Sequence, residues 1–238
     1  MSVPREARGE RGEALTAPVE DYLKAIYAIG KGTEAAATNE IAQRLDLTPA
    51  SVSGMVRRLA DQGLLAYERY RGVKLTESGR RAALRTLRRH RVIEAYLAEA
   101  LGYPWDRVHA EAERLEHAAS DELVDRMAAT IGEPEVDPHG APIPTRDGSV
   151  DETVYRSLAE LEVGSTGVVV RVSDEDPEML RYLAELAIVP GKRLTVKAHA
   201  PFDGPITLSA GRQELSIGPA LAAQVMVSPI ADRGMKRG

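Results

Sequence analysis

Two histidines and two glutamates recur at helical spacing in one short run, and this run limits the possible folds more than any other part of the chain. His109, Glu113, Glu116 and His117 would lie within about 100° of one another around an α-helix. Residues 104–131 are rich in Ala, Leu and Glu, which predicts one continuous helix. The shared face is expected either to bind a divalent metal or to be a solvated surface with pairs at i, i+4.

A second pair of the same residue types precedes this run. His90 and Glu94 are four residues apart in a segment that predicts another helix, and only a short loop separates the two helices. His139 follows the second helix, so four of the five histidines fall in or near this region. Repeated imidazole and carboxylate on neighbouring helices favours the metal interpretation.

Composition excludes several classes of protein. The chain has 238 residues, enough for two domains or for one domain plus a smaller module. Cysteine is absent, which excludes disulfides, a thiolate metal site and a cysteine nucleophile. No apolar run approaches the length of a membrane span, and residues 1–20 are too polar for a signal peptide. A cytoplasmic protein without a membrane partner is expected.

Charge is divided unevenly along the chain. Residues 1–92 contain 17 of the 31 Lys and Arg residues but only 11 of the 36 Asp and Glu residues. The first part is therefore basic and the remainder acidic. This division is typical of a nucleic-acid-binding module joined to a cation-binding one.

The basic part predicts a winged helix-turn-helix. Residues 19–29 form a first helix, and Thr38 is expected to cap a short second helix. Thr48 and Pro49 have the residue types of an N-cap and a first helical position, so a third helix follows to about residue 62. Two short β-prone runs around Tyr70-Arg71-Gly72 then form the wing, before a long helix to about residue 101. The alternative is an ordinary helical hairpin.

The third helix is expected to enter a major groove while the wing contacts phosphates. Its predicted core side has Val52, Met55, Val56 and Leu59 at helical spacing, and the other side is small, polar and cationic. The candidate DNA-binding residues are Thr48, Ala50, Ser51, Ser53, Gly54, Arg57, Arg58, Arg69 and Arg71.

Seven segments, in this order and spacing, resemble the DtxR/MntR family of metal-dependent transcriptional repressors over nearly the whole chain. They are residues 20–27, 48–53, 75–79, 89–94, 108–117, 120–122 and 138–144. The resemblance implies a homodimer that binds double-stranded operator DNA when a divalent metal is bound. It also implies control of metal-uptake or export genes.

The resemblance further implies two metal sites. The primary site corresponds to Asp21, Glu113, Glu116 and His117, and the second to His90, Glu94 and His109. In the family's longer members the C-terminal barrel can add ligands to the second site. Asp176 and Glu178, in an acidic run of that region, are the candidates here, and the alternative is an acidic helix start favoured by the helix dipole.

The implied metal is Mn²⁺, with Fe²⁺ as the alternative. Asp21 and Glu113 stand where iron-responsive relatives have Met and Cys, as in manganese-responsive relatives. Oxygen and nitrogen ligands also suit a hard ion on chemical grounds. Lys24 stands where manganese-responsive relatives place a further carboxylate, which leaves open whether the primary site holds one ion or two.

The expected fold class is mainly α with a C-terminal β module. Residues 1–76 are assigned to a winged helix-turn-helix domain, 77–144 to a helical dimerisation and metal-binding domain, 145–157 to a linker, and 158–230 to an SH3-like (FeoA-like) barrel. The barrel rests on five short strands separated by Gly and Pro turns, with a helix at residues 177–186 between the first two.

The predicted function is therefore a Mn²⁺-dependent repressor, not an enzyme. Two other classes stay open at this stage. A metallohydrolase would need an open coordination position and a general base, and no His-Glu-x-x-His run is present. A winged-helix regulator controlled by an organic ligand would leave the Glu/His face merely solvated.

Overall fold

The computed structural model of the chain describes residues 15–30, 34–68 and 70–230. The chain divides into two compact units, unit 1 (residues 1–86) and unit 2 (residues 87–238). The boundary falls within helix α4 (Glu77–Glu99). Each unit is described by itself below.

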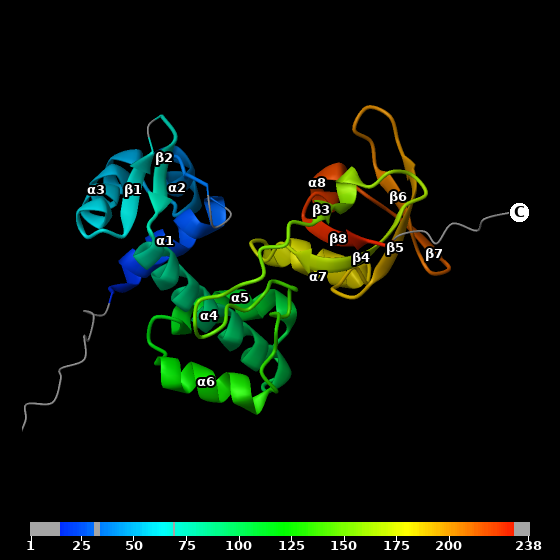
Figure 1. Ribbon diagram of the computed structural model, residues 1–238. Helices are drawn as coiled ribbons and strands as arrows, with labels where there is room; N and C mark the ends of the chain where they lie inside the picture. The colour runs from blue at the N-terminus through cyan, green and yellow to red at the C-terminus, as the bar shows by residue number, and fades with distance from the viewer. Residues whose placement is uncertain (1–14, 31–33, 69, 231–238) are drawn as a thin grey trace, which may run out of the picture. The chain divides into compact units, whose positions relative to one another are not determined.

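Unit 1 has the element order of a winged helix-turn-helix (Figure 1). Its elements are α1 (Ala17–Ile29), α2 (Thr38–Arg44), α3 (Pro49–Asp61), β1 (Leu65–Glu68), β2 (Gly72–Leu75) and the start of α4. A buried aliphatic cluster joins the three helices to the hairpin, with Leu23, Ile41, Leu59 and Val73 among its members. The sequence produces this core because one face of each short helix is apolar.

Local contacts fix the ends of these elements. The Thr48 hydroxyl accepts the Ser51 N–H at 3.3 Å, which confirms the predicted N-cap of α3. The predicted cap at Thr38 is wrong, because Thr38 is already helical. The N-cap is Ala37, whose N–H is accepted by the Glu40 carboxylate at 2.9 Å. A side chain one turn into the helix therefore replaces the expected cap.

The wing pairs antiparallel, from Leu65 opposite Leu75 to Glu68 opposite Gly72. Gly72 has φ +115°, and a Cβ there would lie 2.1 Å from the carbonyl oxygen of Ala36. Only glycine fits this close approach, so the wing is held tightly against the segment before α2.

Unit 2 begins with helices and ends in a β module. After α4 come α5 (Trp105–Leu115), α6 (Asp121–Thr130), β3 (Arg156–Ser157), the 3₁₀ turn η1 (Leu158–Glu160), β4 (Thr166–Val172), α7 (Pro177–Glu185), β5 (Arg193–His199), β6 (Ile206–Ala210), β7 (Gln213–Ile217), α8 (Pro219–Ala222) and β8 (Val225–Pro229).

The expected single helix over residues 104–131 is wrong, because the chain forms α5 and α6 with a turn between them. Ser120 has extended backbone angles and its hydroxyl accepts the Leu123 N–H at 3.2 Å, which starts a new helix. Glu116 and His117 therefore lie in the turn after α5. Strand β3, turn η1 and α8 were also not predicted from the sequence.

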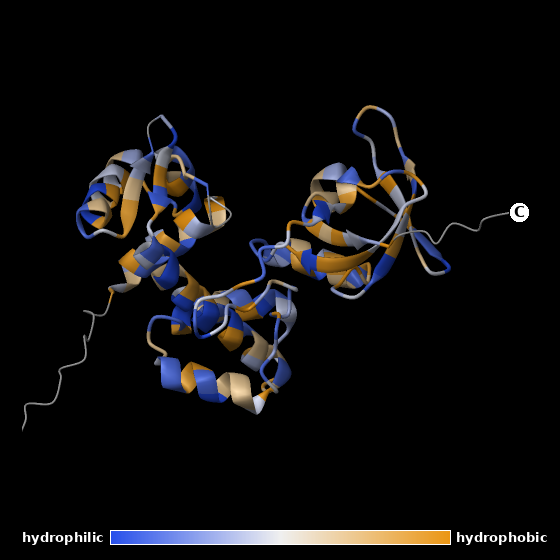
Figure 2. Cartoon of the chain, in the orientation of Figure 1, coloured by the Kyte–Doolittle hydropathy of each residue, from blue (hydrophilic) through white to orange (hydrophobic). Residues whose placement is uncertain are grey.

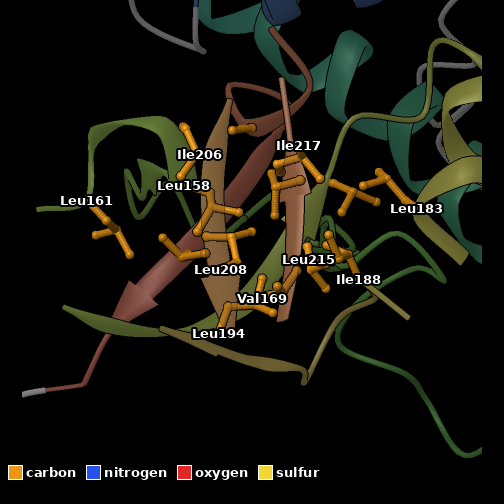
Figure 3. Packing of buried hydrophobic residues seen from close by; sticks show 14 of the residues in the cluster. Leu158, Leu161, Val169, Leu183, Ile188, Leu194, Ile206, Leu208, Leu215 and Ile217 are labelled. Atoms are coloured by element: carbon orange, nitrogen blue, oxygen red, sulfur yellow. The ribbon is translucent and has the colours of Figure 1, made fainter. Parts of the chain in front are cut away.

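The β module is one antiparallel sheet in the order β3-β8-β4-β5-β6-β7. Bulges within β4 and β5 break the register and increase the local twist. Figure 2 shows hydrophobic residues concentrated on β4 and β8. Figure 3 shows members of the buried cluster of this module, among them Val169 of β4, Leu183 of α7 and Ile188 just after it, and Leu215 of β7. The predicted fold class, mainly α with a C-terminal β module, is confirmed.

Backbone contacts attach this sheet to the helical part of unit 2. The Val172 N–H donates to the carbonyl of His139 at 2.9 Å. Gly140 has φ +87°, and a Cβ there would lie 2.0 Å from the Val170 carbonyl oxygen. Trp105 packs against the barrel core, and Arg181 of α7 is 3.1 Å from Asp106 of α5. These contacts hold β4 beside the loop after α6 and α7 beside α5.

Candidate metal centre

Histidine and carboxylate side chains from α4 and α5 converge in unit 2. His90 and Glu94 lie one helical turn apart on α4, and His109 and Glu113 lie one turn apart on α5. Glu116 reaches the same cluster from the turn after α5. The two i, i+4 pairs therefore present two imidazoles and two carboxylates to one another.

His90 is at the centre of this cluster. Its Nδ1 lies 2.6 Å from Glu116 Oε2, and its Nε2 lies 3.0 Å from Glu94 Oε1. Nε2 is also 3.1 Å from His109 Nδ1, which in turn is 3.1 Å from Glu94 Oε1. The residues predicted for the second site, His90, Glu94 and His109, are thus in mutual contact.

The unit 2 residues predicted for the primary site adjoin the same cluster. Glu113 Oε1 lies 3.7 Å from His90 Nδ1 and 3.8 Å from His109 Nε2. His117 Nε2 lies 3.4 Å from Glu116 Oε1. The fourth predicted ligand, Asp21, is a half-buried residue of α1 in unit 1, and its role stays a prediction.

Burial separates this cluster from a solvated helix surface. Glu94 and Glu116 are completely buried, and His90 is 3% exposed. Buried carboxylates are costly unless they are paired with cations or hydrogen-bond donors. The alternative of an ordinary solvated face is therefore wrong for these three residues.

The cluster shifts the protonation of its members. Burial acts to raise the pKa of Glu94, but hydrogen bonds from His109 and His90 outweigh it, so the pKa lies below its usual range. Burial acts to lower the pKa of His109, but its hydrogen bond to Glu94 and the charge of Asp174 outweigh burial and raise that pKa. Glu94 is therefore a carboxylate, and His109 holds its proton to a higher pH than usual.

The β module contributes Asp174 to the cluster. Asp174 Oδ2 lies 3.6 Å from His109 Nδ1. Ligand atoms of His90, Glu94, His109 and Asp174 all lie within 4.8 Å of one another.

Asp174 stands closer to the cluster than the two residues that sequence reasoning selected. Asp176 is the N-cap of α7, where its Oδ1 accepts the N–H groups of Glu178 and Met179 at 2.8 and 3.2 Å. Among the described residues, neither Asp176 nor Glu178 belongs to a group that could hold a metal ion. Since all three acidic residues lie in one short run, the sequence pattern gave no means of choosing between them.

Sequence reasoning gave no role to Asp137 and His139. Both are buried, and their ligand atoms form a second group with Glu94 and Asp174. Burial and the charge of Glu94 raise the pKa of Asp137 to about 6, although Arg91 opposes the shift. Two indications were available in the sequence: His139 is one of the four histidines in or near this region, and it lies in the Pro-rich segment 138–144 that carries part of the family resemblance.

The predicted DNA-binding face of α3 is open to solvent. Its core side, with Val52, Val56 and Leu59, is buried. The opposite residues are exposed, and no atom lies within 4 Å of the position of a Cβ on Gly54. The exposed candidates are Thr48, Ala50, Ser51, Ser53, Gly54, Arg57, Arg58 and, on the wing, Arg71. Arg69 lies outside the described residues.

Hydropathy gives no candidate for a transmembrane helix in residues 15–30, 34–68 and 70–230.

Three family models match consecutive parts of the chain. The iron dependent repressor N-terminal DNA binding domain matches residues 14–73. The iron dependent repressor metal binding and dimerisation domain matches residues 76–145, and the FeoA domain matches residues 156–229.

Individual relatives include proteins named for iron and proteins named for manganese. The iron-dependent repressor IdeR of Mycobacterium tuberculosis (strain ATCC 25618 / H37Rv) is 33% identical over 229 residues, which cover 91% of this chain and 99% of IdeR. The HTH-type transcriptional regulator MntR of Lysinibacillus sphaericus (strain C3-41) is 34% identical over 116 residues, or 49% of this chain and 83% of MntR. A solved structure of a manganese-dependent transcriptional repressor in complex with manganese is 42% identical, with a TM-score of 0.82 over 89% of this chain and 100% of that one.

Proposed function

The chain belongs to the DtxR/MntR family of metal-dependent transcriptional repressors, and from this premise we propose that it is a homodimeric repressor that requires Mn²⁺ to bind its operator. The family consists of DNA-binding repressors, which are not enzymes. Operator binding places the protein in the cytoplasm with the DNA.

The observation that supports manganese is the chemistry of the buried cluster. Its members offer only carboxylate oxygens and imidazole nitrogens, and the chain has no cysteine to supply a thiolate. Such donors suit a hard divalent ion, whereas softer metals favour sulfur ligands. Relatives named for iron and relatives named for manganese both match, so the choice between the two metals rests on these donors.

The residues present fit a divalent cation. Oε2 of Glu94 is buried and has no hydrogen-bond partner among the described residues. An uncompensated buried oxygen beside other carboxylates destabilises the fold, and a bound cation would compensate it. The donor set and this unpaired atom therefore support the same kind of ligand.

Two groups of residues would hold the metal. On the family resemblance, Asp21, Glu113, Glu116 and His117 form the primary site. His90, Glu94, His109 and Asp174 form the second site, with Asp174 in place of the two residues proposed from the sequence. A bound cation supplies positive charge that balances these carboxylates. Glu94 holds its charge without proton release because its pKa is low, whereas His109 must lose its proton to become a ligand.

DNA binding is assigned to α3 and the wing. Ser51, Ser53 and Arg57 are exposed on α3 and would face base edges, while Arg71 of the wing would meet phosphates. A dimer presents two such helices to successive major grooves about 34 Å apart, or a multiple of that distance. Metal can favour this state only if it binds the DNA-competent dimer more tightly than other states.

Operator binding with and without metal tests this function. Fluorescence anisotropy on operator DNA should show tight binding with Mn²⁺ and weak binding with chelator. Glu116→Ala and His117→Ala should each abolish the increase in operator affinity that Mn²⁺ causes. Glu122→Ala is the control, because Glu122 forms an exposed i, i+4 pair with Arg126, and this variant should keep the increase. An operator affinity that is the same with Mn²⁺ and with chelator would show that the protein is not a metal-dependent repressor.

Anaerobic titrations separate manganese from iron as the effector. The operator affinity is measured at equal free concentrations of Mn²⁺ and Fe²⁺. Manganese is supported if it drives operator binding at concentrations at which iron does not. The reverse order would identify Fe²⁺ as the effector and keep the repressor function.

A further inference from the structure

A pocket of about 700 Å³ lies at the end of the β module where β4 begins. Thr166, the first residue of β4, lines it, whereas Asp174 of the proposed metal site follows the other end of the same strand. The rest of the lining comes from the turn before β4 and from β3, β5 and the end of β8. Its volume is typical of small-molecule sites. The pocket therefore has room for a ligand and shares no residue with the candidate metal centre.

Backbone contacts fix the turn that forms one wall of this pocket. The Gly164 N–H donates to the carbonyl of Val196 at 2.8 Å, and the Val196 N–H donates to the carbonyl of Ser165 at 3.0 Å. His199 Nε2 lies 2.9 Å from the carbonyl oxygen of Leu161, which can only accept a hydrogen bond. The wall is therefore formed before any ligand binds, and a ligand need not pay for ordering it.

Two arginines line the pocket from different strands. Arg156 lies in β3 and Arg193 begins β5, and the sheet order places β8 and β4 between them. Among the described residues, neither guanidinium forms a hydrogen bond or an ion pair. Glu160, whose charge interacts with Arg156, does not line the pocket, and its carboxylate accepts the Ser157 N–H at 2.7 Å. The two cationic groups are thus available to an anionic ligand.

The net charge of the lining is small. Glu162 also lines the pocket and, in the described part of the chain, its carboxylate pairs with no cation. Two guanidiniums and one carboxylate leave a balance of one positive charge. This balance favours a ligand with a single negative charge over one with several.

The remaining lining is partly apolar. Val163 is 59% exposed and Ile230 is 36% exposed, so both side chains would gain from being covered by apolar groups. The Ser165 hydroxyl forms no hydrogen bond with other described residues and can donate one to a ligand. Residues 231–238, which follow Ile230 in the sequence, carry three cationic side chains and one acidic one, so their charge does not suit a pocket lined by arginines.

We propose that this pocket binds a small organic carboxylate with an apolar body. Arg156 and Arg193 would hold the carboxylate, because a planar guanidinium matches its two oxygens. The Ser165 hydroxyl would donate to it, and Val163 and Ile230 would cover the apolar body. The inference goes beyond the proposed function, since it involves neither the metal ligands nor the DNA-binding residues.

Nuclear magnetic resonance of the full-length protein tests this site. Isotope-labelled, metal-stripped protein is titrated at constant ionic strength with sodium benzoate, which joins a carboxylate to an apolar ring. The amide resonances of Gly164 and Ser165 should shift and reach saturation. Benzyl alcohol, which has a similar ring without the charge, should leave them in place at the same concentrations. If benzoate shifts neither resonance, the proposal is wrong.

Phenyl phosphate separates a carboxylate site from a phosphate site. At neutral pH it carries more negative charge than benzoate on the same ring. Weaker binding of phenyl phosphate than of benzoate supports the proposal. Tighter binding of phenyl phosphate at the same resonances would overturn the carboxylate assignment.

Variants of the two arginines test which groups hold the anion. Arg156→Gln and Arg193→Gln should each weaken benzoate binding about ten-fold, because each removes a charge-assisted hydrogen bond. Arg212→Gln is the matched control, since Arg212 is exposed in the turn between β6 and β7 and does not line the pocket. This variant should bind benzoate as the wild type does. Wild-type affinity in both Arg156→Gln and Arg193→Gln would contradict the proposal, and unchanged resonances elsewhere in the β module show that the variants are folded.

Discussion

His90 Nδ1 and Glu116 Oε2 are 2.6 Å apart, although one lies on α4 and the other in the turn after α5. The same imidazole contacts Glu94 through its other nitrogen. One ring thus lies between two completely buried carboxylates and contacts both of them.

His90→Ala should destabilise the metal-free protein. The substitution leaves Glu94 and Glu116 buried without the ring between them, and a buried acceptor that loses its hydrogen-bond partner costs about 1–3 kcal/mol, more for a charged group. The free energy of unfolding is measured by urea denaturation in the presence of chelator. A loss below about 1 kcal/mol would mean that the two carboxylates are already compensated by other groups.

Asp174→Asn should weaken Mn²⁺ binding, whereas Asp176→Asn should not. Asp174 lies beside His109, while the Asp176 carboxylate caps α7. We expect at least a ten-fold loss of affinity for the first variant, on the order of the effect of altering residues that support a metal site. Isothermal titration calorimetry measures both variants. Equal Mn²⁺ affinities of the two variants would show that the β module supplies no ligand to the metal site.

Mn²⁺ affinity should rise with pH through the titration of His109. The pKa of this ring is raised above 6.5 by Glu94 and Asp174, so at lower pH the metal must displace a proton. Affinity should therefore increase between about pH 6 and 8, with proton release that falls as the pH rises. Calorimetry in buffers of different ionisation enthalpy measures that release. An affinity independent of pH would exclude His109 as a ligand.

Arg57→Ala should weaken operator binding, because Arg57 is exposed on α3. If the side chain contacts a phosphate, the slope of log affinity against log salt should fall by about 0.9. If it contacts a base, the preference among operator sequences should change instead. Arg126→Ala, an exposed change on α6, is the control. Identical operator affinities of Arg57→Ala and the wild type would show that the exposed face of α3 around Arg57 does not contact the operator.

Local patterns were sufficient to predict the order of the elements in unit 1, although not the N-cap of α2. Thr48 and Pro49 marked the start of α3, and Val52, Val56 and Leu59 marked its buried side. These features depend only on neighbouring residues, so the sequence contains all the information needed. The same holds for the pairing of His90 with Glu94, which follows from helical spacing alone.

Features that depend on distant contacts were not predictable in this way. The helical pattern of His109, Glu113, Glu116 and His117 continues through the end of α5, so periodicity hid the break that Ser120 makes. Periodicity also cannot distinguish a buried carboxylate from an exposed one.

The choice of Asp174 over its acidic neighbours depends on how β4 ends beside α5. Likewise, Asp137 and His139 join a group of possible ligand residues only because the loop after α6 lies against β4. Neither relationship has a local sequence pattern.

The close approach of Gly140 to β4 packs the β module against the loop after α6, so under the proposed function this module belongs to the metal sensor. A shortened chain ending before residue 156 would keep helices α1 to α6 but lose Asp174 and the strand that contacts the His139 loop. We expect such a product of proteolysis to need a higher metal concentration to bind its operator. Cleavage in the segment before the β module would therefore raise the metal concentration required for repression and leave the DNA-binding residues of unit 1 unchanged.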